Sequence, residues 1–135
     1  MRALILAAIL IGMGCKSSVE PTGPLREEMY GNYFLETVNG QPVPYSEEDQ
    51  YGVLYTFHYG EIRLGADNEC SNALHWQYEW EDQFFEENIE SQCFPYVTGN
   101  QVSLQNLPGG GLLVLDFSGN TLTTYMGEYT LVFRK

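Results

Sequence analysis

Residues 70–93 read CSNALHWQYEWEDQFFEENIESQC, and this stretch decides the fold. Its first half places apolar or aromatic side chains at every second position, which is the period of a β-strand with one apolar face. A turn at Glu81-Asp82 would return the chain as an antiparallel strand. The resulting register sets Tyr78 opposite Phe85, a favourable aromatic pair. The stretch therefore predicts a long β-hairpin.

The same register sets Cys70 opposite Cys93. Directly opposed residues in an antiparallel ladder have Cα atoms roughly 4.5 to 5.5 Å apart, a separation that a disulfide accepts. We expect this bond rather than two free buried thiols. No metal is expected, because the chain offers neither a second cysteine pair nor two closely spaced histidines.

The hairpin register also points Glu87 to the face that carries Trp76. A carboxylate on an apolar face costs free energy unless it is paired or hydrated. We expect a β-bulge that turns the second strand, and with it Glu87, outward. The alternative is a polar anchor inside a ligand cavity.

Period-two alternation continues through the chain after Met29, and no stretch shows a convincing helical period. Glycine, asparagine and proline separate about eight to nine short strands, and Gly60 is expected to separate a strand over 53–59 from one over 62–64. Short connections favour an antiparallel up-and-down meander. Closing it into a barrel removes both exposed edges, so we predict an all-β barrel, with a two-sheet sandwich as the alternative.

Aromatic residues form a stripe that is expected to face the barrel interior, with Tyr59 among them. An eight-stranded barrel is just wide enough to be filled by side chains or to hold one small ligand. A packed core is the expected outcome, and an open pocket is the alternative. The candidate cavity residues are Tyr33, Tyr55, Phe57, Trp76, Tyr78 and Trp80.

The chain has 135 residues with 18 acidic and 6 basic side chains, a formal net charge of -12. This charge argues against nucleic-acid binding, and the 2 Trp, 10 Tyr and 7 Phe argue against disorder. Carboxylates crowd residues 79–90 without the spacing of a calcium loop, so we interpret them as a solvated hairpin tip. His58 is expected on the outer surface.

The first residues form a leader in which Arg2 precedes an apolar run too short to span a bilayer. The leader resembles that of bacterial lipoproteins, with a small residue directly before Cys15. The resemblance implies cleavage after residue 14 and acylation of Cys15, including palmitate, as a membrane anchor. An ordinary secreted protein is the alternative. Residues 15–28 then predict a flexible tether, and residues 29–135 the barrel domain.

Several short motifs together resemble small bacterial lipocalin-like domains, with META/HslJ-like domains as a neighbouring alternative. In lipocalins the first strand carries Gly-x-Trp, and a late basic residue packs over the indole. Here Tyr33 stands at the Trp position, and Arg134 is the candidate for the basic role. The motifs are Gly31–Leu35, Val38–Pro44, Gly60–Asp67, Gly119–Thr123 and Tyr129–Lys135.

No nucleophile stands beside a base in a recognisable motif, so we expect no enzymatic activity and no cofactor. The leading hypothesis is a monomeric lipoprotein on a bacterial membrane, expected to be the outer membrane, whose barrel binds a small apolar ligand. The alternative is a protein–protein interaction module with a filled core and an acidic outer face.

Overall fold

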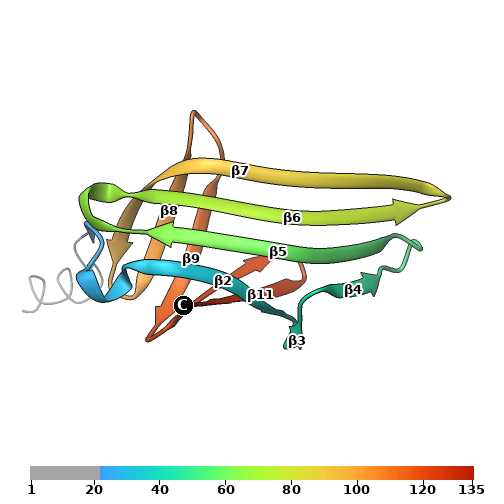
Figure 1. Cartoon of the computed structure of the whole chain (residues 1–135), viewed down its shortest axis with the longest axis horizontal. Coiled ribbons are helices and arrows are strands. Elements are labelled where there is room, and N and C mark those ends of the chain that lie inside the picture. The colour runs from blue at the N-terminus through green and yellow to red at the C-terminus, as the bar shows by residue number, and fades with distance from the viewer. Residues whose placement is uncertain (1–21) are drawn as a thin grey trace, which may run out of the picture.

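The chain closes on itself through backbone pairing on both sides of β2 (Gly31–Val38). In this computed structural model, which describes residues 22–135, β2 pairs with β5 (Leu54–Leu64) and with β11 (Tyr129–Arg134). The strands between these two pair antiparallel in chain order (Figure 1). They are β6 (Cys70–Trp80), β7 (Gln83–Thr98), β8 (Gln101–Leu107), β9 (Leu112–Ser118) and β10 (Thr121–Met126).

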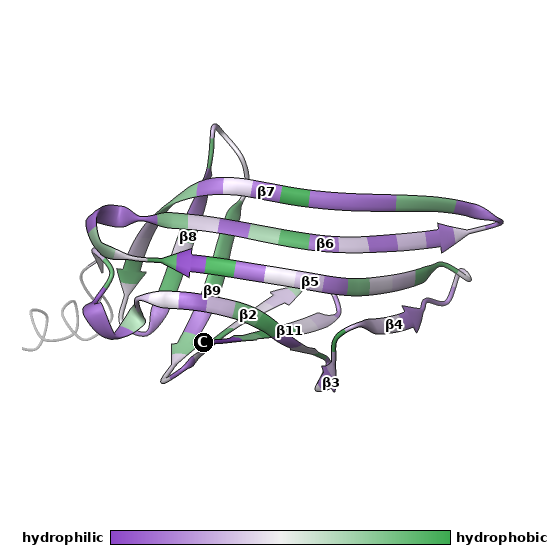
Figure 2. Ribbon diagram, viewed as in Figure 1, coloured by the Kyte–Doolittle hydropathy of each residue, from purple (hydrophilic) through white to green (hydrophobic). Residues whose placement is uncertain are grey.

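The described residues thus form a closed, eight-stranded, up-and-down antiparallel barrel, as the sequence predicts. Closure rules out the two-sheet sandwich. Figure 2 shows the alternation of apolar and polar residues along the strands. The remaining elements are not among the eight strands of the closed barrel. They are β1 (Thr22–Gly23), β3 (Gln41–Pro42), β4 (Tyr45–Glu48) and the 3-10 turns η1 (Glu27–Met29) and η2 (Ala66–Asn68). No helix within residues 22–135 is long and apolar enough to cross a membrane.

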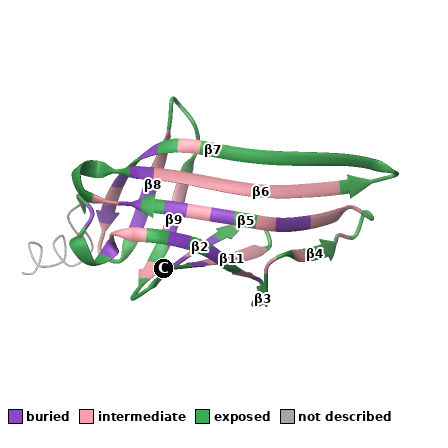
Figure 3. Ribbon diagram, in the orientation of Figure 1, coloured by how far each residue is buried: buried purple, intermediate pink, exposed green. Residues whose placement is uncertain are grey.

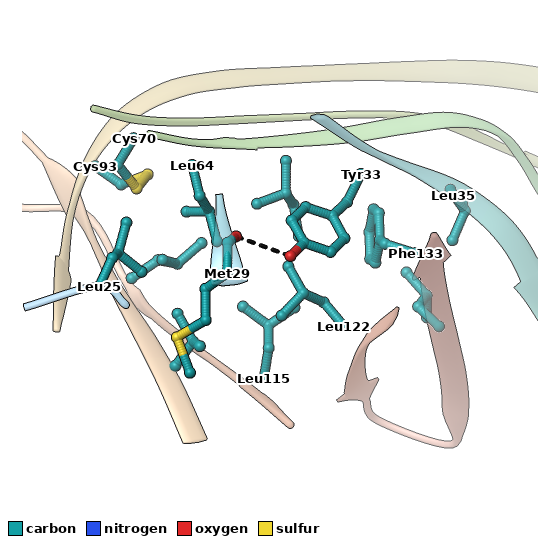
Figure 4. Packing of buried hydrophobic residues seen from close by; sticks show 14 of the residues in the cluster. Leu25, Met29, Tyr33, Leu35, Leu64, Cys70, Cys93, Leu115, Leu122 and Phe133 are labelled. Carbon is teal, nitrogen blue, oxygen red and sulfur yellow. Dashed lines mark hydrogen bonds between the residues drawn. A yellow bond between two sulfur atoms is a disulfide. The ribbon is translucent and has the colours of Figure 1, made fainter. Parts of the chain in front are cut away.

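One end of the barrel is closed and filled with side chains (Figure 4). The side chains of Met29, Tyr33, Leu115 and Leu122 are fully buried there. The Tyr33 hydroxyl donates a hydrogen bond to the Met29 carbonyl over 2.8 Å, which satisfies both buried groups. The predicted packed core therefore exists at this end.

The predicted hairpin register is confirmed: β6 and β7 pair without interruption from Ser71–Gln92 to Trp80–Gln83. Cys70 and Cys93 form the expected disulfide, with Cα atoms 5.0 Å apart. The expected bulge is wrong, since this ladder contains no register shift.

The expected boundary between tether and barrel changes as well. Residues 1–21 lie outside the described residues, and with them the leader and Cys15. Residues 22–28, assigned to the tether from sequence, pack on the barrel. Thr22 pairs with Thr98, Leu25 is buried, and Arg26 donates a 2.7 Å hydrogen bond to the Gly99 carbonyl. The apolar side chain of Leu25 gains by leaving water, which is why the folded part begins before residue 29.

The predicted turn at Gly60 is also wrong, because residues 54–64 form the single strand β5. Its pairing with β6 shifts register between Phe57 and Tyr59, which is a β-bulge. The bulge reverses the direction of the next side chains. Tyr59 is therefore 44% exposed on the outside, where its hydroxyl donates to Glu61, instead of facing the interior.

The long strands β5, β6 and β7 continue beyond the closed barrel as an extension (Figure 1). We call it the wing and define it as β4 with residues 54–58 of β5, 75–80 of β6 and 83–91 of β7. The closed barrel ends there because β2 pairs with β5 only over residues 61–64, and β8 pairs with β7 only over residues 92–98. Most of β7 in the wing is exposed (Figure 3). Glu87 stays on the Trp76 face at little cost, because solvent reaches it there.

Candidate ligand-binding pocket at the barrel mouth

A pocket of about 560 Å³ lies where the wing meets the turn between β10 and β11. Its floor is the bulged region of β5 together with the neighbouring part of β6, and its opposite wall comes from the end of β10 and the start of β11. The apolar and aromatic lining consists of Tyr55, Phe57, Trp76, Met126 and Tyr129. Strand alternation explains this convergence, since Tyr129 shares the inward face of β11 with buried Leu131 and Phe133.

The rings of the lining contact one another. The Phe57 and Tyr129 ring centroids are 5.0 Å apart in an edge-on arrangement, and Trp76 stacks with Phe57 at 6.2 Å. Tyr55 lies 6.0 Å from Trp76 and 6.1 Å from Tyr129. These separations fall within the range of favourable aromatic pairs. The pocket therefore presents a continuous aromatic wall rather than isolated rings.

Two polar groups of this wall stand out. The indole Nε1 of Trp76 is the buried side-chain polar atom of residues 22–135 that lacks a hydrogen-bond partner within the protein. Burial, followed by the negative charge of Glu47, raises the pKa of Tyr129 to about 12. The phenol of Tyr129 is therefore neutral throughout the physiological pH range.

Carboxylates lie at the rim of the aromatic wall. Asp49 follows β4, Glu128 lies in the β10–β11 turn, and both line the pocket. A second hollow, of about 390 Å³, shares Asp49, Glu128 and Tyr129 with the first and adds Glu47 and Glu48 from β4. The mouth of the barrel is thus apolar on its walls and acidic at its rim.

A second apolar space lies beside the pocket, toward the barrel interior. This smaller space of about 180 Å³ shares Met126 with the pocket and is lined by Leu74, Ile89 and Leu131, among others. The polar pair in this space is satisfied internally, since Asn72 Nδ2 donates to Asn106 Oδ1 over 2.7 Å. The two spaces are therefore neighbours, with Met126 lining both.

Three of the six predicted cavity residues line the main pocket, namely Tyr55, Phe57 and Trp76. Tyr78 lies next to it and extends the row of rings along the wing, stacked on Phe85 with ring centroids 4.8 Å apart.

The other two predicted residues lie elsewhere. Tyr33 belongs to the packed core at the closed end, away from the pocket. Trp80 is 46% exposed near the wing tip, because it stands beyond the strands that would cover it.

Sequence reasoning missed Met126, Tyr129, Asp49 and Glu128. Strand alternation could have identified Met126 and Tyr129, because they project to the same face of their strands as the apolar residues Leu122 and Leu131. Nothing comparable marks the carboxylates, since they lie in loops whose positions depend on the tertiary structure.

The histidines lie on the outer face of the wing, as expected for His58. His58 Nε2 lies 2.6 Å from Gln77 Oε1, and His75 Nε2 lies 2.7 Å from Glu86 Oε1. Within residues 22–135, no group of three or more His, Cys, Asp or Glu side chains is arranged to hold a metal ion.

Fold and site together define a class: a closed eight-stranded antiparallel barrel with an aromatic pocket at its mouth, compatible with a lipocalin-like barrel. Comparison of the chain with protein-family models, with curated proteins and with solved structures found no match.

Proposed function

We propose that this protein is a monomeric, non-enzymatic lipoprotein of the bacterial envelope whose barrel binds a small apolar ligand at its mouth. The observation that carries the proposal is the pocket of about 560 Å³ between the wing and the β10–β11 turn, walled by four aromatic rings and Met126. Its volume lies within the range of small-molecule sites, which are typically apolar with few polar groups.

The packed closed end sets the depth at which a ligand lies. Because Tyr33, Leu115 and Leu122 are fully buried, the inner half of the barrel is occupied by the protein's own side chains. A ligand would therefore rest on Trp76 and Phe57 and extend at most into the space beside Leu74. Its apolar contact area would supply most of the affinity.

The direct test uses the chain that begins at Lys16, which contains every strand of the barrel. A fluorescent apolar probe is titrated into this protein and into the Trp76→Ala variant. We expect micromolar binding that weakens about tenfold or more on loss of the indole. Tyr125→Ala is the matched control, because Tyr125 is an aromatic residue that is 65% exposed on the outside.

Two results would contradict the proposal: no probe binding at micromolar concentration, or equal binding by the parent and Trp76→Ala. Urea unfolding of each variant separates loss of the pocket from loss of the fold.

Membrane anchoring through Cys15 rests on the leader sequence alone, and the position of β1 bears only on how an anchored barrel would be oriented. Thr22 pairs with Thr98, at the end of β7 remote from the wing. An anchor at Cys15 would therefore hold the closed end toward the membrane and leave the pocket facing away. Intact mass spectrometry of membrane-extracted protein tests this, with an acylated N-terminal Cys15 expected and an unmodified one contradicting it.

A second candidate function, a protein interaction module, is favoured by the free edge of the wing. Among the described residues, β7 has no strand partner on its β8 side over 83–91. Such an edge can accept an extended segment of another protein. Its carboxylates Glu86, Glu87 and Glu90 would repel a second copy and attract a basic segment. A pull-down of envelope proteins that weakens strongly with salt, without probe binding, would favour this function.

A further inference from the structure

The aromatic pocket carries negative charge on three sides. In the β4–β5 ladder Glu47 stands directly opposite Tyr55, and in the β6–β7 ladder Glu87 stands directly opposite Trp76. Opposed residues of an antiparallel ladder project to the same face, so both carboxylates lie on the face that carries the rings. Asp49 and Glu128 complete the surroundings as lining residues.

None of these four carboxylates has a cationic partner among the described residues. The salt bridges of residues 22–135 involve Glu28, Glu36, Glu61 and Glu86 instead. One oxygen of Asp49 accepts backbone hydrogen bonds from Tyr51 and Val53, which fixes the carboxylate but leaves its charge uncompensated. The sequence itself contains no Lys or Arg between Arg63 and Arg134.

We propose that the ligand of this pocket is a cationic amphiphile: an amine or quaternary ammonium head held over the rings of Tyr55, Trp76 and Tyr129 between the rim carboxylates, with an apolar tail directed toward Leu74 and Leu131. This inference rests on the proposed function and names its ligand class.

Two physical effects act in the same direction. The face of an aromatic ring attracts a cation within about 6 Å of its centre, most strongly for Trp and Tyr. Uncompensated carboxylates around a partly apolar pocket raise the local concentration of cations and oppose the entry of anions. The raised pKa of Tyr129, caused by burial and then by Glu47, agrees with a negative potential at this wall.

An apolar tail has a neighbouring space toward which it can point. The main pocket and the inner space share Met126, and the inner space is lined by Leu74, Ile89 and Leu131. A head group at the rim would therefore direct its apolar chain past Met126 toward this inner space. An anionic amphiphile of the same shape would place its charge against Asp49 and Glu128.

The test compares three ligands that share a ten-carbon chain: decyltrimethylammonium, decanoate and the uncharged decyl glycerol ether. Each is titrated below its micelle concentration into the chain that begins at Lys16, at low and at moderate salt, with binding followed calorimetrically. We expect the ammonium to bind about tenfold more tightly than the uncharged ether, and decanoate to bind most weakly. The preference should shrink as salt increases.

A double variant locates the effect. Asp49→Asn with Glu128→Gln removes two rim charges while keeping the oxygen of residue 49 that caps the loop. It should remove most of the ammonium's advantage over the ether, with the remainder coming from the ring faces and from Glu47 and Glu87, and leave the affinity for the ether unchanged. Glu90→Gln is the matched control, because it removes one charge from the opposite face of the wing. Glu90 and Glu87 are three residues apart in β7, so their side chains project to opposite faces.

The outcomes separate this inference from the proposed function. Equal binding of all three ligands, tighter binding of decanoate, or an ammonium preference that is undiminished in the double variant would overturn the cationic class while leaving an apolar binding protein. Binding of none of the three would overturn both.

Discussion

The Lys135 ammonium lies 5.2 Å from the centre of the Tyr33 ring and donates hydrogen bonds to the carbonyls of Glu28 and Tyr30, over 2.6 and 2.9 Å. Lys135 thus covers the ring of Tyr33 and links it to η1 through the hydrogen bond to Glu28. The expected basic partner, Arg134, faces outward instead and pairs with Glu36. The prediction for Arg134 is therefore wrong by one residue. In a strand, one residue is the difference between the two faces.

The first prediction follows from this arrangement. Lys135→Met should lower the free energy of unfolding by about 1–2 kcal/mol, because a cation–π contact and two charged hydrogen bonds are lost. Arg134→Met should cost about 0.5 kcal/mol or less, since its ion pair with Glu36 is largely exposed. Urea unfolding at neutral pH measures both. Equal losses for the two variants would contradict the assigned role of Lys135.

The second prediction concerns alkaline pH. Burial raises the pKa of Tyr33 to about 12 from an ordinary value of 10.0. The folded state therefore favours the neutral phenol, and this contribution to stability is complete below pH 10 and is lost as the pH rises to 12. Tyr33→Phe should reduce the fall in stability across this range while costing about 1 kcal/mol at neutral pH, because the hydrogen bond to Met29 is lost.

Urea midpoints at several pH values between 8 and 12 are the measurement for Tyr33. Tyr125→Phe is the control, since Tyr125 is exposed. An unchanged alkaline profile in Tyr33→Phe would show that the buried phenol is not responsible.

The third prediction concerns the close approach of side chains to Gly60 in β5. A Cβ atom at Gly60 would lie 2.8 Å from Phe133 and 3.0 Å from the Leu35 Cβ, closer than packed atoms allow. Gly60→Ala should therefore destabilise the barrel by about 1–3 kcal/mol. Gly111→Ala should be near neutral, because nothing lies within 4 Å of its added methyl group. Thermal unfolding of both variants compares them, and equal melting temperatures would refute the packing argument.

The fourth prediction concerns the disulfide. The Cys70–Cys93 bond closes a loop with a sequence separation of 23, and removing both cysteines by serine substitution should cost about 3 kcal/mol. The hairpin register should survive, because the paired side chains of β6 and β7 also specify it. Denaturant unfolding measures the cost, and unchanged circular dichroism checks the fold. A stability equal to that of the parent would contradict the prediction.

Much of the fold follows from local pattern. The alternation in residues 70–93 specifies two strands, their turn and the cysteine pairing. A tight turn between antiparallel neighbours allows only one pairing register, so the position of the turn determines which residues stand opposite each other. Three pocket residues, Tyr55, Phe57 and Trp76, follow from the same parity. The sequence by itself determined the all-β class, the hairpin and the inward face of β6.

Only the tertiary structure decided where that parity breaks and where the barrel ends. The bulge after Phe57 turns Tyr59 outward, and the limited pairing of β2 and β8 leaves the wing and Glu87 in solvent. Bringing Tyr129 into contact with Phe57 likewise depends on closure of the barrel. These features arise from contacts between residues far apart in the chain, and a local period of two residues carries no information about such contacts.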